Sequence, residues 1–237
     1  MKANNKRSNQ AGFTLVEIAI VLVIIGLLLG GILKGQEMIT QAKIKNVVND
    51  LNGVSAAMYG YQDRYKALPG DDKNANPRWA ASKAGDGDGV VGGKYLDTAT
   101  LDASGNVTAG SESAVFWHHL RLAGFISGTG PDQPFNAVSG KMGVQTGDGA
   151  YVPATTAPGP ALAGPSSAPP GFTALILCSA NLPDKIAISV DSQMDDGIAI
   201  SGSVRGQKQS QPNPAITNAA TAYVEDGVST YVVCRTL

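Results

Sequence analysis

The chain opens with a long apolar run, "AGFTLVEIAIVLVIIGLLLGG", from Ala11 to Gly31. Between Phe13 and Leu33, only Thr14 and Glu17 are strongly polar. As an α-helix this segment would be about 31 Å long, close to the roughly 30 Å hydrocarbon core of a bilayer. The run therefore predicts a membrane-spanning helix, and it places one carboxylate, Glu17, among hydrocarbon side chains.

The flanks of this segment indicate its orientation. Residues 1–12 contain Lys2, Lys6 and Arg7 and no acidic residue. Basic residues beside a membrane span stay on the cytoplasmic side, so the rest of the chain is expected on the opposite side. A secretory signal would have a shorter apolar core followed by a small-residue cleavage site. After Leu33 the sequence continues as "KGQEMITQAKIK", which predicts further helix and a retained segment.

Glu17 needs an explanation because an acid inside a membrane is costly and usually has a partner or a role. One interpretation places its carboxyl group near the lipid headgroups, where it is solvated or protonated. The other gives it a partner. No lysine or arginine lies within one helical turn of Glu17 in this chain, so such a partner would come from another molecule.

The stretch "GFTLVEIAIVLVIIGLLLG" resembles the N-terminal signature of type IV pilins and type II secretion pseudopilins, the class III signal peptide. The resemblance is close over residues 11–35 and looser through the predicted helix to residue 65. It implies that a prepilin peptidase removes residues 1–12 by cutting between Gly12 and Phe13. It also implies that the new N-terminal residue, Phe13, is N-methylated.

The acidic position of this family falls on Glu17, the fifth residue of the implied mature chain. The resemblance implies that Glu17 attracts the α-amine of an adjacent subunit, so that two charges costly in lipid form a pair. The implied function is a structural subunit of a type IV pilus or a type II secretion pseudopilus. The implied partners are other pilin or pseudopilin subunits, the prepilin peptidase and N-methyltransferase, the inner-membrane assembly platform and membrane lipid.

The resemblance also implies where the protein resides. It would be a single-pass inner-membrane protein with a cytoplasmic N-terminus and a periplasmic head, later incorporated into a pilus or pseudopilus. Removal of the leader would leave a mature chain that extends from Phe13 to Leu237. Such a chain is long for a main shaft subunit of the family, which favours a minor one.

Beyond the membrane segment, apolar residues recur at spacings of three and four, which predicts that residues 36–68 form the amphipathic half of the same helix. Pro69 and Gly70 predict its end. Residues 13–35 would be the membrane half, and residues 69–237 a globular head. The expected fold is α+β, with the long helix packed against an antiparallel β-sheet in a pilin-like roll. The predicted apolar stripe consists of Ile44, Val47, Leu51, Val54, Met58, Tyr61 and Tyr65.

Within the head, "SESAVFWHHLRLAGF" predicts a short helix that begins at Ser111 or Ser113 and ends at Gly124. The Pro-, Ala- and Ser-rich segment 153–171 predicts an exposed loop. A hairpin is predicted with its turn at Asp196-Gly197. The predicted strands are Thr173–Cys178, Lys185–Val190, Ile198–Val204 and Thr230–Cys234.

The sequence "AGDGDGVVGG", residues 84–93, alternates acids with glycines as calcium-binding loops do. Asp86 and Asp88 would supply oxygen ligands, and Asp71 and Asp72 could complete the shell if the chain folds back. Some pseudopilins of the resembled family bind calcium in their globular domain. Asp-Gly repeats are equally good turn formers, and the closing acid of an EF-hand is missing. Calcium is thus one interpretation and a plain turn the other.

Two cysteines, Cys178 and Cys234, follow apolar runs of strand character. They could be buried thiols, or they could form a disulfide if the head lies in an oxidising compartment. His118 and His119 are adjacent on the predicted helix and point about 100° apart, so they would not readily bind one metal. One of them is expected to face solvent.

Composition limits the alternatives. Charged residues make up 16% and the net charge is −1, so no basic field is predicted to bind nucleic acid. A membrane-anchored periplasmic enzyme has no support, since no serine–histidine–acid pattern, metal cluster or phosphate loop is evident. No catalytic residue is predicted. A membrane-anchored periplasmic binding module, for calcium or glycans, remains an alternative in which the protein does not polymerise and Glu17 is dispensable.

Overall fold

The computed structural model of the protein describes residues 14–147, 171–209 and 222–237. The chain divides into two compact units, Met1–Ala42 and Lys43–Leu237. The predicted leader 1–12, the expected N-terminal residue Phe13 and all but Gly171 of the predicted loop 153–171 lie outside the described residues.

The first unit consists, in its described part, of the beginning of helix α1, which covers Leu15–Tyr65. Residues 15–34 are all exposed, although nearly all of them are apolar. Helix α1 is the one described helix long and apolar enough to cross a membrane, and none of its apolar window is buried inside the structure. This confirms the predicted N-terminal apolar helix, which ends at Tyr65, three residues before the predicted boundary at residue 68.

The second unit begins with the remainder of α1, whose inner face enters the core. The predicted stripe is confirmed, because its side chains are among those that the helix buries and only Tyr65 is partly exposed. Spacing by three and four residues keeps them on one side of the helix. The buried members are Ile44, Val47, Leu51, Val54, Met58 and Tyr61.

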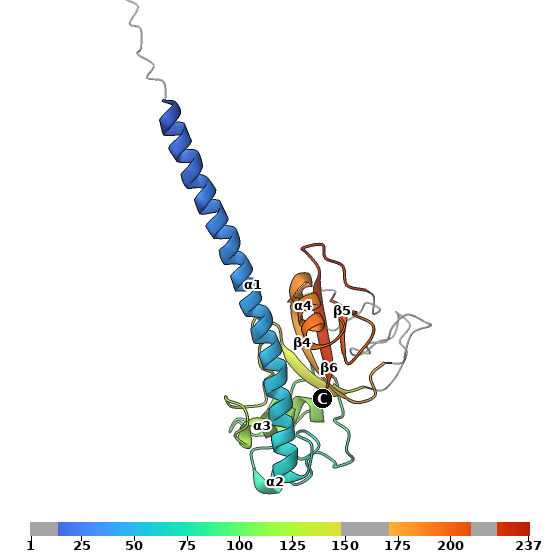
Figure 1. Ribbon diagram of the computed structural model, residues 1–237. Coiled ribbons are helices and arrows are strands. Elements are labelled where there is room, and N and C mark those ends of the chain that lie inside the picture. Colours follow the sequence, from blue (N-terminus) through green and yellow to red (C-terminus); the bar gives the residue numbers. More distant parts are fainter. Residues whose placement is uncertain (1–13, 148–170, 210–221) are drawn as a thin grey trace, which may run out of the picture. The chain divides into compact units, whose positions relative to one another are not determined.

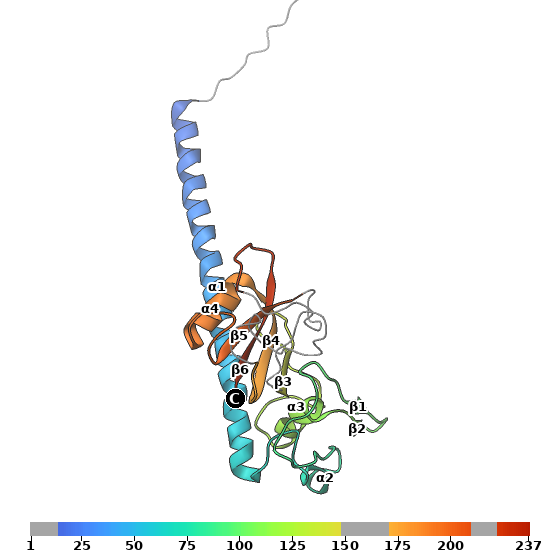
Figure 2. The same ribbon diagram turned by 90° about the vertical axis from the view of Figure 1, so that its right-hand side faces the viewer.

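The head contains an antiparallel four-stranded sheet in the order β3-β4-β6-β5 (Figure 1). Figure 2 shows these strands side by side, with a separate two-stranded sheet of β1 and β2. The four strands are β3 (Met142–Thr146), β4 (Leu175–Pro183), β6 (Thr230–Thr236) and β5 (Val204–Lys208); the small sheet comprises β1 (Thr100–Leu101) and β2 (Val107–Ala109).

Alternation along the strands gives the large sheet two buried faces. Leu177 of β4 and Val233 of β6 join the core that also contains residues of α1, α3 (Glu112–Leu122) and α4 (Asp184–Met194). Residues of opposite parity, among them Ile176 and Val232, join a second, smaller cluster. Period-two alternation explains the division, because successive strand residues point to opposite faces. The α+β fold expected from the sequence is confirmed.

The predicted helix between Ser111 and Gly124 is confirmed as α3, and a short helix, α2, covers Ala75–Arg78. Two predicted strands, Thr173–Cys178 and Thr230–Cys234, overlap β4 and β6. Strand β3 was not predicted.

The predicted strand Lys185–Val190 is wrong, because this segment belongs to helix α4. In "KIAISV" the apolar residues fit both a period of two and a helical stripe. The buried residues Ile186, Ala187 and Val190 follow the helical spacing. The predicted strand Ile198–Val204 is wrong as well except at its last residue, where β5 begins. Consequently Asp196-Gly197 lies in the connection from α4 to β5 and not in a hairpin turn.

Candidate functional site

The start of α1 is closed by reciprocal hydrogen bonds between Thr14 and Glu17. The backbone N–H and the hydroxyl of Thr14 both donate to Oε2 of Glu17, each at 2.8 Å. The backbone N–H of Glu17 donates in return to Oγ1 of Thr14 at 3.3 Å. This is a capping box, which satisfies N–H groups that the first helical turn leaves unpaired. Glu17 therefore has hydrogen-bond donors within its own chain, and a cationic partner from another molecule stays a prediction.

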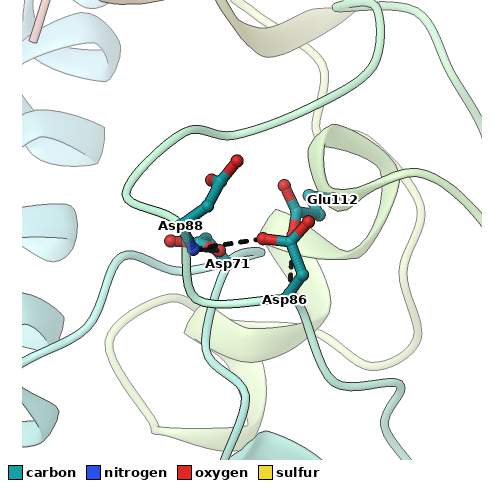
Figure 3. Close-up of side chains that lie close together, drawn as sticks. All are labelled: Asp71, Asp86, Asp88 and Glu112. Carbon is teal, nitrogen blue, oxygen red and sulfur yellow. Dashed lines mark hydrogen bonds between the residues drawn. The ribbon is translucent and has the colours of Figure 1, made fainter.

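An acidic cluster lies in the head, well separated in sequence from this cap. Asp71, Asp86, Asp88 and Glu112 each offer a carboxylate oxygen, and these atoms lie within 4.8 Å of one another (Figure 3). Asp71 follows the end of α1, Asp86 and Asp88 lie in the loop before β1, and Glu112 is the first residue of α3.

Backbone N–H groups of the loop hold the two inner carboxylates of this cluster. Oδ1 of Asp71 accepts from the N–H of Gly87 at 2.6 Å, and its Oδ2 accepts from Gly89 at 2.8 Å. Oε1 of Glu112 accepts from the N–H of Asp86 at 2.9 Å, and its Oε2 accepts from Gly92 at 2.8 Å. The glycines suit this wrapping, since Gly87 and Gly89 have positive φ angles of 78° and 89°.

Electrostatic repulsion is concentrated at this cluster. Burial, together with the nearby charges of Asp71 and Asp86, raises the pKa of Glu112, although hydrogen bonds from Gly92 and Asp86 oppose the shift. Oxygen ligands from several carboxylates are what calcium takes in proteins. The donor set thus fits a calcium ion, whose charge would relieve the repulsion.

Residues 7–33 match a family model described as the prokaryotic N-terminal methylation motif. The chain carries this methylation motif, the class III signal peptide of type IV pilins. The motif indicates a pilin-like or pseudopilin-like precursor of structural type, and together with the apolar start of α1 it fits anchoring in the inner membrane. No curated protein and no solved structure matches the chain.

In the head, Asp72 has different partners from its neighbour Asp71. Oδ2 of Asp72 lies 2.7 Å from Nη1 of Arg78 and accepts a hydrogen bond from the Tyr61 hydroxyl, also at 2.7 Å. Burial opposes the charge of Asp72, but the bonds from Arg78 and Tyr61 outweigh it and lower the pKa of Asp72. Of the four acids that the sequence singled out for calcium, the structure brings together Asp71, Asp86 and Asp88, and it engages Asp72 elsewhere.

Glu112 is the member of the cluster that sequence reasoning missed. It lies far beyond Asp86 along the chain and belongs to no acidic motif. The only signal in the sequence was its place in the first turn of a predicted helix, where acids favour the N-terminus. That signal predicts a helix start and says nothing of a neighbouring loop.

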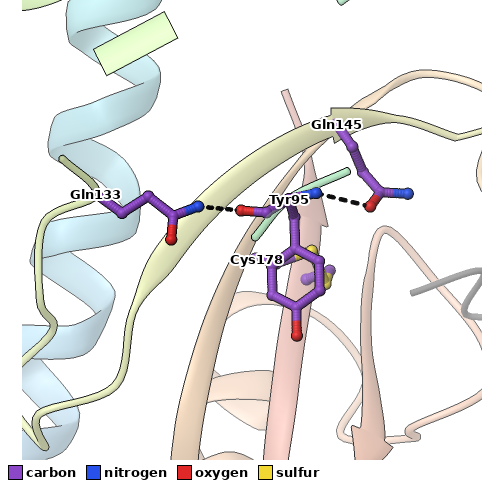
Figure 4. The surroundings of a disulfide bond; sticks show 5 residues. Tyr95, Gln133, Gln145 and Cys178 are labelled. Carbon is purple, nitrogen blue, oxygen red and sulfur yellow. Dashed lines mark hydrogen bonds between the residues drawn. A yellow bond between two sulfur atoms is a disulfide. The ribbon is translucent and has the colours of Figure 1, made fainter. Parts of the chain in front are cut away.

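The disulfide Cys178–Cys234 joins two strands of the head, which confirms the disulfide interpretation (Figure 4). The two residues are direct partners on the adjacent strands β4 and β6, and both are fully buried. Tyr95 lies beside this disulfide. Its backbone N–H donates to Oε1 of Gln145 at 3.1 Å, and its carbonyl accepts from the Gln133 side chain.

Both histidines of α3 are buried, so the expectation that one faces solvent is wrong. Nδ1 of His119 accepts from the N–H of Gly70 at 2.9 Å, which leaves Nε2 to donate to the carbonyl of Lys83 at 2.9 Å. Burial lowers the pKa of His119 to about 4. His119 therefore serves as a neutral structural link between α3 and the loop that follows α1.

Proposed function

We propose that the mature chain is a structural subunit of a type IV pilus or a type II secretion pseudopilus. In this proposal a prepilin peptidase cuts between Gly12 and Phe13, Phe13 is N-methylated, and the subunit assembles through α1. The observation that supports it most directly is that the methylation motif at residues 7–33 covers the start of an exposed apolar helix whose first turn contains Glu17.

The exposed apolar surface supports assembly in two environments. Nearly all side chains of residues 15–34 are apolar and exposed, and a surface of this kind is unfavourable in water. Lipid would cover it in the membrane, and the helices of other subunits would cover it in a filament. The energetic role of Glu17 would be to pair with the methylated amine of a neighbour, which sets the axial position of one subunit relative to the next.

The proposed topology has a cytoplasmic N-terminus and a periplasmic head. The basic residues of the leader support it through the preference of positive charge for the cytoplasmic side. The disulfide Cys178–Cys234 also supports it, since disulfides persist in the periplasm and are rare in the cytoplasm. The proposed partners are other pilin or pseudopilin subunits, the processing peptidase and methyltransferase, and the assembly platform.

Two measurements test this function. A mass spectrum of protein purified from membranes should show an N-terminal methylated phenylalanine at position 13; an intact leader would contradict the proposal. Glu17→Ala should abolish incorporation into filaments. Glu37→Ala is the matched control, because Glu37 is another exposed acid of α1 and is paired with Lys34 at 2.7 Å. Normal incorporation of Glu17→Ala would contradict the proposed role of Glu17, whereas absence of the wild-type chain from filaments would favour a membrane-anchored binding module that does not polymerise.

We also propose that the acidic cluster binds calcium. The supporting observation is the convergence of Asp71, Asp86, Asp88 and Glu112 from three separate parts of the head. A cation there would join the loop of residues 86–92 to the start of α3, and thereby stiffen the head. The role is structural, and it is compatible with either a filament subunit or a binding module.

A further inference from the structure

The cap at the start of α1 gives Glu17 a second partner besides the one proposed for the filament. Oε2 of Glu17 already accepts two hydrogen bonds from Thr14. Cap and acid lie at the beginning of the segment that is apolar and exposed, and unpaired polar groups in such a segment are costly in lipid.

Thr14 meets two hydrogen-bonding requirements at the start of α1. The first turn leaves backbone N–H groups without partners, and an intramembrane carboxylate needs hydrogen-bond donors. Threonine offers a hydroxyl that donates to the Glu17 carboxylate and accepts from the Glu17 N–H at the same time. An aliphatic side chain of the same shape could do neither.

Resting on the proposed filament function, we propose that Thr14 is a positioning residue that holds the Glu17 carboxylate within its own chain until the subunit assembles. Assembly is then an exchange of hydrogen bonds, in which the amine of a neighbouring subunit takes up the carboxylate that Thr14 presents. No covalent bond changes. The cap keeps the acid hydrogen-bonded while the subunit waits in the membrane, and it directs the carboxylate toward the end of the helix.

Four variants separate the cap from the charge. Thr14→Ser keeps the hydroxyl, and Thr14→Val replaces it with a methyl group of similar size. Glu17→Gln keeps an acceptor that can close a capping box but removes the charge, and Glu17→Ala removes both.

The first readout is amide hydrogen exchange of the full chain in detergent micelles, which does not depend on filaments. The amide of Glu17 should exchange several-fold faster in Thr14→Val than in the wild type, and Thr14→Ser should restore the slow rate. The amide of Thr14 should stay protected in Glu17→Gln and lose protection in Glu17→Ala. Unchanged exchange at Glu17 in Thr14→Val would overturn the proposal.

The second readout is the fraction of membrane subunit that enters filaments, measured together with the N-terminal mass. Thr14→Val should be incorporated several-fold less than the wild type, Thr14→Ser should match the wild type, and Glu17→Gln should fail although its cap is intact. Incorporation of Thr14→Val at the wild-type level would overturn the proposal. Failure of the wild type itself to be cleaved or incorporated would instead refute the filament function. The exchange data would still test whether Thr14 holds the Glu17 carboxylate.

Discussion

Asp72 and Arg78 form an ion pair, with 2.7 Å between Oδ2 and Nη1, in which the side chain of Asp72 is 1% exposed and that of Arg78 is 29% exposed. Arg78 also lies over the ring of Tyr65, 4.1 Å from its centroid. Because Tyr61 of α1 donates to the same carboxylate oxygen, the pair joins the end of the long helix to the loop that begins the acidic cluster.

Asp72→Ala should lower the free energy of unfolding by about 2 kcal/mol, since it leaves three donors, on Tyr61, Arg78 and the backbone of Asn74, without their acceptor at a mostly buried position. Partial exposure of Arg78 keeps the loss below that of a fully buried pair. Urea denaturation of the full chain in detergent measures it. Asp63→Ala is the control: Asp63 pairs with Lys66 at 2.9 Å on the exposed surface, and its loss should be undetectable. Equal effects of the two substitutions would contradict this account.

Calcium should raise the melting temperature of the protein relative to a chelator, because a ligand that binds only the folded state stabilises it. At a concentration of about 100 times its dissociation constant the gain is about 2.7 kcal/mol. Asp86→Asn should reduce the shift. Asp102→Asn, an equal change of charge in an exposed turn outside the cluster, should leave it intact. Identical melting with calcium and chelator would assign the Asp-Gly loop to plain turn formation.

Lowering the pH should change the stability of the protein through two buried groups, His119 and Asp191, whose effects have opposite signs. His119 has a pKa of about 4 when folded, against 6.5 for the free side chain, so between these values only the unfolded chain takes up the proton. This difference lowers the free energy of unfolding by about 3 kcal/mol as the pH falls from 6.5 to 4. Burial raises the pKa of Asp191 from 3.8 to about 6, so its protonation favours the folded state over much of the same range.

Substitution should separate these two dependences. His119→Gln should become more stable relative to the wild type as the pH falls from 6.5 to 4, and Asp191→Asn should become less stable relative to the wild type between pH 6 and pH 4. Urea midpoints at each pH measure both. Parallel stability curves for the wild type and His119→Gln would show that His119 takes up its proton at the same pH in the folded and the unfolded chain, which would contradict this account.

The disulfide should contribute about 4 kcal/mol to the free energy of unfolding, because it joins residues 56 positions apart and restricts the unfolded chain. The double variant Cys178→Ala with Cys234→Ala should therefore unfold at a markedly lower urea concentration. Both sulfur-bearing residues are fully buried, so reductant should release thiols only when denaturant is added. If reductant released thiols from the native protein as fast as from the denatured protein, the buried position of the disulfide would be contradicted.

Local patterns account for the parts of the fold that could be predicted. Helix α1 and its buried stripe follow from spacing along one segment, and the disulfide follows once the head is placed in an oxidising compartment, since two cysteines allow one pairing. Helix α4 was mistaken for a strand because "KIAISV" fits two periods. Which period applies depends on the surface that the segment packs against, here the core formed with α1 and the sheet.

The sequence alone determined the apolar anchor, the long helix and the presence of an acid in its first turn, because each depends on residues within a few positions of one another. Tertiary structure decided which partners the acidic residues of the head have. Asp71 accepts a hydrogen bond from a loop residue 16 positions further along the chain and lies close to Glu112 of α3. Asp72, which is adjacent to Asp71 in the sequence, instead binds Arg78 and Tyr61. Adjacent carboxylates differ in this way because their surroundings come from distant segments, which only the folded chain brings together.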